Sequence, residues 1–486
     1  MGHRPGCRGF SARALVVLLA VSAVAGTLRA QASDSISPTA LQQIQALQEE
    51  KKTRTPAQRR VDSNLLFEAK QRRGIAVAAG VPSLQTGIEV SDQGTVVVDI
   101  TATVSGSLLD AIERLGGHIL QSHSVYRSIR AEVPLFSVET LAAHPDVLFI
   151  QPKQEATTNR GMPTEIPALR GVTASLLRSV RPGFAARAAA VRSQLAAALA
   201  RNASKEASGA KPLKINKVNT SEGVVTHRAD LAQSTFGAMG AGVKVGVLSD
   251  GVDSRASLQA SGDLPAVTVL PGQAGNGDEG AAMLEIVYDM APAAQLYFAT
   301  AFNGISSFAQ NIHDLRTAGC NIIIDDVSYF VETPFQKGQT GGVASTSNGG
   351  LVIQAVNDVT AAGALYFSSA ANSGGKDKNT SGTWEGNFVD GGAADPGLLG
   401  EAGRLHDFDP SVTVTPYDAL SANGGGFPAL FWSDPLGGSA NDYDLFLLNP
   451  SGTNVVGASN DEQSGTQDPF EIINVGSMTS GQRLVI

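Results

Sequence analysis

Cysteine is nearly absent from this chain, whose 486 residues include only Cys7 and Cys320. The N-terminal segment that carries Cys7 is expected to be removed as a signal peptide, which leaves a single cysteine and excludes an intramolecular disulfide. Cys320 begins the apolar stretch "CNIII", where the sequence predicts a small buried residue and not a nucleophile. The fold must therefore be stabilised without disulfide crosslinks.

Tryptophan and excess charge are also scarce: there are two tryptophans, and the net charge is only −9. No long basic run follows the first residues, so the composition gives no electrostatic support for nucleic-acid binding. An apolar content of 42% with 17% charged residues is typical of globular proteins. The length of 486 residues predicts two to four domains.

Long apolar runs are absent except near the N-terminus. Arg4, Arg8 and Arg13 precede "ALVVLLAVSAVAG", and Ala30-Gln31-Ala32 has the small-x-small pattern of a cleavage site. This pattern predicts a secretory signal peptide over residues 1–32, because the run is short for a membrane span. An uncleaved anchor is the alternative. We expect a secreted protein without a membrane segment after signal cleavage.

The N-terminal half divides into three further segments. Residues 33–94 are polar and helix-prone, and predict a helical leader with no visible chemistry. Residues 95–158 follow the order β-α-β-β-α-β, which predicts a ferredoxin-like α+β unit. Residues 159–215 predict a linker with an Ala/Arg-rich helix, whose spaced arginines favour a solvated face over a binding patch.

The C-terminal half changes composition. In residues 216–404 continuous apolar strands alternate with helices, which predicts an α/β domain: a doubly wound parallel sheet with helices on both faces. Its polar clusters "SDGVD", "DDVS" and "AANSGG" follow strands, where functional groups of such sheets gather. The short strands of residues 405–486 predict part of an antiparallel β-sandwich.

Four blocks of the α/β segment, in order, resemble the subtilases, the subtilisin-like serine peptidases. "VKVGVLSDGVDS" resembles the strand that ends in the family's aspartate, and "GDEGAAMLEIVYDMAPAAQLYFATAF" resembles its His-Gly-Thr helix and the strand after it. "NIIIDDVSYF" is similar to the substrate-binding strand, and "ALYFSSAANSGG" to the strand that supplies the oxyanion-hole asparagine. The resemblance implies that the ferredoxin-like unit is an inhibitory propeptide.

Glutamate stands at the place of the family's catalytic histidine, since Glu279 aligns with it when the chain is counted back from Ala291-Pro292. The resemblance then implies Glu279 as general base, as in the related sedolisins, with a pKa suited to that task. The sedolisin partner four residues later is replaced by Met283, so the partner acid must come from the first strand. The alternative is an acidic residue stabilised by the helix dipole.

The partner acid is expected to be Asp250, although a gapless alignment places Ser249 there and Asp253 is the alternative. Both aspartates could instead be turn formers. The resemblance assigns Asn372 as the oxyanion donor, against a simple turn role for that asparagine.

The resemblance places Asp326, Ser328 and Tyr329 on the substrate strand, with Asp325 beside them. The two adjacent acids could select basic substrate residues, raise each other's pKa or cap the strand.

The serine nucleophile is missing. No Gly-Thr-Ser-x-Ala-x-Pro sequence occurs, and Ser477 in "GSMTSG" lacks the alanine and proline. The resemblance then implies that the β-sandwich of residues 405–486 is inserted into the peptidase domain and truncated. We therefore expect a chain that ends before the serine and is inactive by itself.

The leading hypothesis is a secreted serine endopeptidase made as a zymogen, with polypeptide substrates, its own propeptide domain as a partner, and no cofactor or metal. A non-catalytic subtilase-fold protein that binds peptides or cell-surface material is the alternative. A calcium-binding module is weaker, because "DYD" and "SND" do not reach a ligand set.

Overall fold

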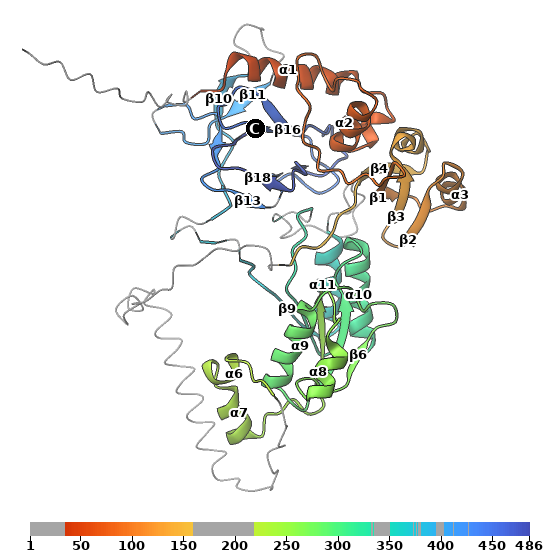
Figure 1. Cartoon of the computed structure of the whole chain (residues 1–486), viewed down its shortest axis with the longest axis vertical. Coiled ribbons are helices and arrows are strands. Elements are labelled where there is room, and N and C mark those ends of the chain that lie inside the picture. The colour runs from red at the N-terminus through yellow and green to blue at the C-terminus, as the bar shows by residue number, and fades with distance from the viewer. Residues whose placement is uncertain are drawn as a thin grey trace, which may run out of the picture. The chain divides into compact units, whose positions relative to one another are not determined.

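The structure is a computed structural model of the chain, and it describes the following residues: 35–158, 218–331, 334, 350–372, 374–375, 377, 381–394, 403–411, 413–425 and 427–486. The expected signal peptide (1–32) and the linker helix within 159–215 lie outside the described residues. Figure 1 colours the described elements along the chain.

Two capped helices begin the described chain. Helix α1 (Pro38–Thr53) starts after Ser37, whose side chain accepts a hydrogen bond from the amide of Ala40. Helix α2 (Ser63–Arg72) follows the short 3-10 helix η1 (Gln58–Arg60), and Asp62 caps it by accepting from the amide of Asn64. Such caps satisfy amides that have no partner within the helix. The helices expected in the leader are therefore present.

A four-stranded antiparallel sheet follows, in the strand order β2-β3-β1-β4. The apolar side chains of β1 and β3 form one core with those of α3 and α4. The element order is β-α-β-β-α-β, as the sequence predicts. Its elements are β1 (Thr95–Ala102), α3 (Gly106–Arg114), β2 (His118–His123), β3 (Ser128–Pro134), η2 (Leu135–Ser137), α4 (Val138–Ala142) and β4 (Val147–Pro152).

The α/β segment forms a five-stranded parallel sheet in the order β6-β7-β5-β8-β9. The strands are β5 (Lys244–Ser249), β6 (Val267–Val269), β7 (Gln295–Thr300), β8 (Ile322–Asp325) and β9 (Leu365–Ser368). The helices are α6 (Gly223–Thr226), α7 (Ala229–Phe236), α8 (Arg255–Ser261), α9 (Glu279–Met290), α10 (Ile305–Thr317) and α11 (Leu351–Ala361).

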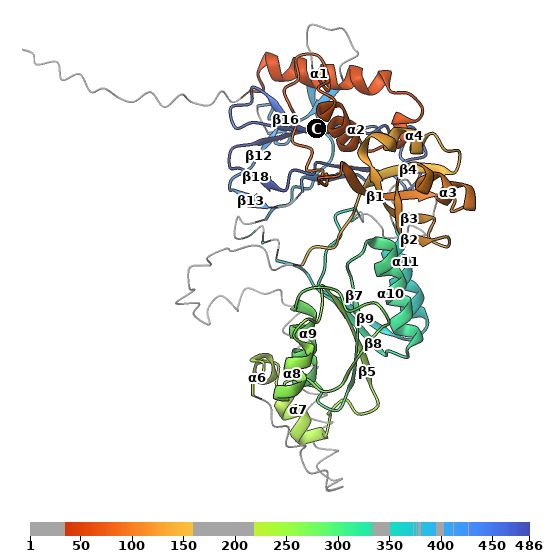
Figure 2. The same cartoon turned by 45° about the vertical axis from the view of Figure 1, so that its right-hand side comes forward.

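Helices cover both faces of this parallel sheet, as Figure 2 shows. Alternate strand residues point to opposite faces, and the two cores follow that period. Val245 and Val247 of β5 pack in the core that contains α9, whereas Leu248 packs in the core of α10 and α11. Cys320 is fully buried in the second core, and burial raises the pKa of its thiol to about 11. The predictions of a parallel two-faced sheet and a buried Cys320 are confirmed.

The remaining strands are short and antiparallel. Four of them form a sheet in the order β12-β19-β15-β16, and three pairs stand beside it. The strands are β10 (Asp390–Ala393), β11 (Arg404–His406), β12 (Asp418–Ala419), β13 (Gly424–Gly425), β14 (Ala429–Phe431), β15 (Leu445–Leu448), β16 (Val455–Ser459), β17 (Phe470–Ile472), β18 (Ser477–Met478) and β19 (Arg483–Val485).

The N-terminal helices share a core with these C-terminal strands. Ile44 and Leu47 of α1 and Phe67 of α2 pack in one buried cluster with Phe446 of β15 and Val455 of β16. The sequence predicts helices here but gives no sign of this packing partner, which lies almost 400 residues away. None of the helices in the described part of the chain has the length and apolarity that a membrane crossing requires.

Candidate active site

The carboxyl end of β5 places Asp250 beneath the first turn of helix α9. Ser249 is completely buried, and Asp250, the next residue, is 7% exposed. Asp250 Oδ1 accepts hydrogen bonds from the amide of Gly251 at 2.6 Å and from the amide of Gly280 at 3.1 Å. The acid that follows β5 is thus tied to the helix that begins at Glu279.

Glycines allow this close approach. Gly277 has φ +109°, and a Cβ atom there would lie 2.2 Å from Asp250 Oδ2. A Cβ atom on Gly280 would lie 2.4 Å from Cε2 of Phe298 and 2.5 Å from the carbonyl oxygen of Gly251. A larger residue at either position would displace the helix from Asp250.

Glu279 is half-buried and lies among two other carboxyl groups. Burial raises the pKa of Glu279, and the negative charges of Asp326 and Asp250 raise it further, as does a hydrogen bond with the side chain of Asp326. A hydrogen bond with the side chain of Thr158 acts in the opposite direction on this pKa. The environment of Glu279 therefore favours the protonated carboxyl, although a helix N-terminus alone would favour the charged form.

The other acids near this loop have different partners. Asp253 is exposed, and its Oδ2 accepts a hydrogen bond from the amide of Gly277 at 2.8 Å. Asp278 accepts from the amide and the hydroxyl of Ser254, at 2.6 and 2.8 Å. Of the two candidates for the partner acid, Asp250 is the one whose charge acts on Glu279.

The two aspartates at the end of β8 differ in their surroundings. Asp325 is buried and accepts hydrogen bonds from the Tyr366 hydroxyl at 2.6 Å and the Ser368 hydroxyl at 2.7 Å. Burial raises the pKa of Asp325, while those two hydrogen bonds lower it. Asp326 is half-buried and interacts with Glu279. Asp325 thus joins β8 to β9, and the next residue, Asp326, joins β8 to Glu279.

A short segment of the chain after β4 lies antiparallel to the segment after β8. The Thr157 amide donates to the Ser328 carbonyl at 2.9 Å, and the Ser328 amide donates to the Thr157 carbonyl at 2.9 Å. Ala156 is buried in the core of α10 and α11, and the hydroxyl of Tyr329 donates to the carbonyl of Ala301 at 2.6 Å. The segment carrying Ser328 and Tyr329 therefore holds an extended peptide.

Residues Thr157 and Thr158 are functional candidates that the sequence did not single out. Thr158 hydrogen-bonds Glu279, and Thr157 is the residue paired with Ser328. The only sequence signal for them is their position just after the ferredoxin-like unit. Upstream, Glu155 pairs with Arg130 of β3 and accepts a hydrogen bond from the amide of Asn303 at 3.1 Å. These contacts attach the segment both to the ferredoxin-like unit and to the loop that precedes α10.

Asn372 lies beyond β9, at the same carboxyl edge as Asp250 and Asp326. The preceding Ala371 has φ +58°, and the side chain of Asn372 is exposed. Ser477 belongs to strand β18, where it pairs with Gly425, far in the sequence from this cluster.

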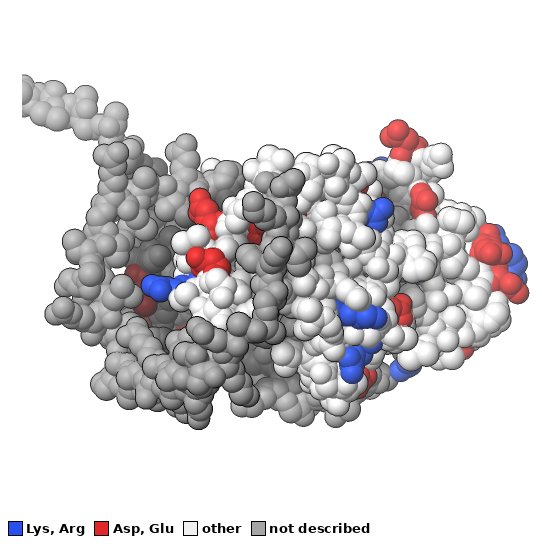
Figure 3. Space-filling model, turned by 90° about the horizontal axis from the view of Figure 1, so that it is seen from below, with Lys and Arg blue, Asp and Glu red and all other residues white. Residues whose placement is uncertain are grey.

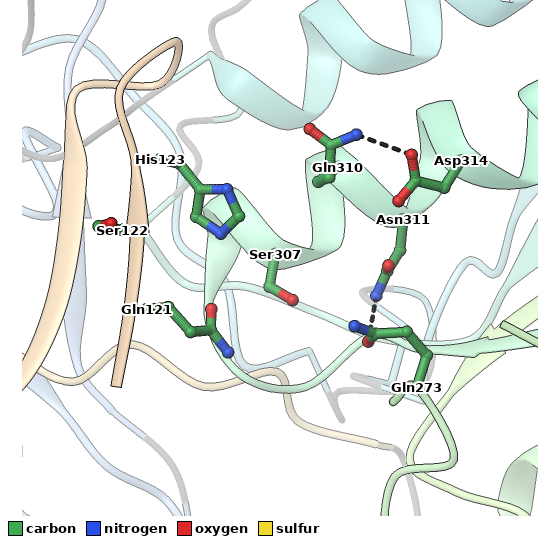
Figure 4. Close-up of a pocket in the computed structure, with 8 residues that line it drawn as sticks. All are labelled: Gln121, Ser122, His123, Gln273, Ser307, Gln310, Asn311 and Asp314. Carbon is green, nitrogen blue, oxygen red and sulfur yellow. Dashed lines mark hydrogen bonds between the residues drawn. The ribbon is translucent and has the colours of Figure 1, made fainter. Parts of the chain in front are cut away.

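A polar cavity of about 320 Å³ lies elsewhere, between β2 and α10 (Figure 4). Its lining includes His123 from β2 and Asn311 from α10, whose Nδ2 donates to Gln273 at 2.7 Å. Burial lowers the pKa of His123. The cavity holds none of the residues of the carboxyl cluster, and we place the candidate site at the cluster because the charges and the bound peptide segment are there.

Among the described residues there is no group of three or more histidines, cysteines and acids that could hold a metal ion. Figure 3 shows one face of the molecule, on which acidic and basic side chains of described residues are scattered among neutral ones.

Neither a family model nor a curated protein matches the chain. Among solved structures, it is similar to the epidermin leader peptide processing serine protease from Staphylococcus aureus, with 8% identity, a TM-score of 0.31, and coverage of 59% of this chain and 62% of that one. A mutant of that protease gives 10% identity, a TM-score of 0.30, and coverage of 59% and 63%.

Fervidolysin from Fervidobacterium pennivorans, a keratinolytic enzyme related to subtilisin, gives 11% identity, a TM-score of 0.27, and coverage of 61% of this chain and 44% of that one. The chain thus spans less than two thirds of each of these structures.

Proposed function

We propose that this protein is a secreted serine endopeptidase of the subtilisin-like type, made as a zymogen, in which Glu279 is the general base and Asp250 its partner acid. The observation that carries the proposal is the cluster of Glu279, Asp250 and Asp326 beside an extended peptide segment. A peptidase needs these two features together: a base with a tuned pKa, and a strand that holds the substrate in line with it.

In the proposed reaction, Glu279 accepts a proton and later returns it. Glu279 as carboxylate takes the proton of a serine hydroxyl while the serine oxygen bonds to the substrate carbonyl carbon. Glu279 then returns the proton to the amine as the C–N bond breaks, and water later hydrolyses the ester. Asn372 stabilises the oxyanion in this scheme. The 486 residues contain no Gly-Thr-Ser-x-Ala-x-Pro sequence, so the nucleophile is the part of the proposal that they do not supply.

The proposal that the protein is made as a zymogen rests on the contacts of residues 155–158. Thr157 pairs with Ser328 through two backbone hydrogen bonds, as an added substrate strand would. Thr158 hydrogen-bonds Glu279, which brings the chain at these threonines next to the proposed base. The ferredoxin-like unit, directly upstream, then acts as an inhibitor that delivers its own tail to the site.

The test is a pair of variants in the protein encoded by the complete gene. Glu279→Gln keeps the size of the side chain and removes the base, so casein cleavage and cleavage of the chain between the ferredoxin-like unit and the peptidase domain are expected to fall by at least about 100-fold. Glu285→Gln, on the same helix six residues later, is the matched control and should retain both. Full activity of the Glu279→Gln protein would refute the proposed base.

The alternative is a non-catalytic protein that binds peptides along the Ser328 segment. The pairing of Thr157 with Ser328 supports it equally, because strand addition needs no nucleophile. Incubation with peptide substrates separates the two functions: capture without any cleavage by the complete protein would favour the binding protein.

A further inference from the structure

The N-terminal segment (residues 35–90) and the C-terminal β unit (residues 403–486) are joined by a buried interface. Ile44 and Leu47 of α1 contribute to a core with Phe446, Leu448 and Val455, all of them buried. The amide of Gln85 also donates to the carbonyl of Val456 at 2.8 Å. The segment thus supplies part of the hydrophobic core of this unit.

A network of ion pairs lies beside that core. Lys51 Nζ lies 2.7 Å from carboxyl oxygens of both Asp442 and Asp444, and its side chain is only 9% exposed. The Arg54 side chain is 2% exposed; its Nη2 donates to Asn460 Oδ1 at 2.7 Å, and its Nη1 lies 3.8 Å from Asp461. Lys51 pairs with carboxylates of the β unit, whereas Arg54 pairs with Glu50 of its own helix at 2.8 Å and reaches the β unit through Asn460 and Asp461.

Two features make this interface hard to separate. Without Lys51 and Arg54, the acids of the β unit would stay in a partly buried place without their cations, which is far more costly than burying the pair. The backbones also meet closely: a Cβ atom on Gly87 would lie 1.6 Å from the carbonyl oxygen of Asn474. An isolated β unit would therefore have both an open core and uncompensated charge.

We propose that residues 35–90 are a permanent structural part of the C-terminal β unit and stay bound to it when the chain is cut between residues 158 and 218. The ferredoxin-like unit, connected to this segment by the peptide chain, then stays with the molecule as well. Retention itself does not depend on the proposed peptidase activity. If that activity exists, one cut leaves the inhibitor tethered at a high local concentration.

The experiment uses the full chain with a recognition sequence for an added site-specific protease inserted within 159–217. After complete cleavage, the two fragments are separated by size exclusion at neutral pH. We expect the N-terminal fragment to elute with the C-terminal one in a 1:1 ratio. Elution as two separate species would overturn the proposal, whatever the outcome of the Glu279 test.

Variants locate the source of the retention. Arg54→Met should speed fragment dissociation by at least about tenfold. Arg59→Ala removes an exposed ion pair with Glu462 in the same interface. This variant should change the rate of fragment dissociation by less than about threefold. Thr157→Pro, which breaks the pairing with Ser328, should leave the fragments together. Release of the fragment by Thr157→Pro, with Arg54 intact, would show that the β unit is not what holds it and would overturn the proposal.

Discussion

At the residue scale, the carboxyl groups of Asp250 and Asp326 make the protonation of Glu279 depend on its neighbours. Burial raises the pKa of Glu279, and Asp326 raises it further by its charge and by a hydrogen bond. A general base works only when deprotonated, so the proposed peptidase activity should appear as the pH rises through the raised pKa of Glu279. The pH at which activity rises therefore shows how strongly burial, Asp250 and Asp326 raise the pKa of Glu279.

The first prediction follows from this dependence. Asp326→Asn removes a negative charge and should shift the acidic limb of the pH–rate profile of the complete protein toward lower pH. Steady-state peptide cleavage across pH measures the shift, with Glu285→Gln as the control expected to leave the limb in place. A limb that stays in place in the Asp326→Asn protein would mean that Asp326 does not act on the base.

The second prediction concerns the glycine at the start of helix α9. Gly280→Ala places a methyl group 2.4 Å from the ring of Phe298 and 2.5 Å from a backbone carbonyl, so we expect a loss of about 1–3 kcal/mol in the free energy of unfolding. Gly106→Ala, whose added methyl group would meet no atom within 4 Å, should change it little or raise it slightly. Urea unfolding followed by circular dichroism measures both, and equal stabilities would contradict the close contact.

The sequence alone singles out some residues of the candidate site. Asp250 lies in a polar cluster that follows a strand, and the carboxyl edge of a parallel sheet is where such groups gather. Glu279 was assigned only through the resemblance to the subtilases, at the place of their histidine. The sequence leaves Asp250 and Asp253 as alternatives, since only the folded loop shows which of them faces Gly280. The approach of Thr158 to Glu279 had no local signal, because it depends on how a distant segment lies on the sheet.

At the scale of elements, the pairing of Thr157 with Ser328 depends on two backbone hydrogen bonds. Thr157→Pro removes the donating amide, so the Ser328 amide should lose protection and exchange its hydrogen about tenfold faster or more. Thr157→Ala keeps the amide and should preserve the slow exchange. Hydrogen exchange read out by mass spectrometry tests this, and equal rates in both variants would exclude the pairing in solution.

The elements themselves were largely predictable. The apolar runs of β5, β7 and β8 and the periodicity of α9 and α10 are local signals, and the sheet forms where they predict it. The packing of α1 was not predictable, because its glutamines and charged residues together outnumber its apolar residues, as is typical of a solvated helix. Lys51 and Arg54 look like surface residues until their acids, from residues 442–461, are brought to them.

At the scale of the whole molecule, the interface between the N-terminal segment and the β unit contains acids that hold protons. Burial raises the pKa of Asp62 to about 8, with the charge of Asp461 adding to it and a hydrogen bond from Asn64 opposing it. Burial raises the pKa of Asp461 to about 6 against the opposing charges of Arg54 and Lys51. The buried Glu471 of β17 has a raised pKa too, mainly through burial.

The fourth prediction is a pH dependence of stability with a definite sign. The folded chain keeps protons on Asp62 and Asp461 that the unfolded chain has already lost, so the free energy of unfolding should fall as the pH rises toward about 8. Asp62→Asn still caps α2 and should flatten this fall. Urea unfolding at several pH values between 5 and 8 measures it, with the exposed Asp92→Asn as the control. A fall of the same steepness in the Asp62→Asn protein would show that Asp62 titrates normally.

The shared core of α1 and the C-terminal strands has a consequence for synthesis. A ribosome makes Leu47 first and completes β15 and β16, against which α1 packs, almost 400 residues later. At a synthesis rate of about 5–20 residues per second, roughly 20–80 seconds pass between the synthesis of α1 and that of its partner strands. During that time the apolar side chains of α1 are without these packing partners, and the shared core can form only after β15 and β16 have been synthesised.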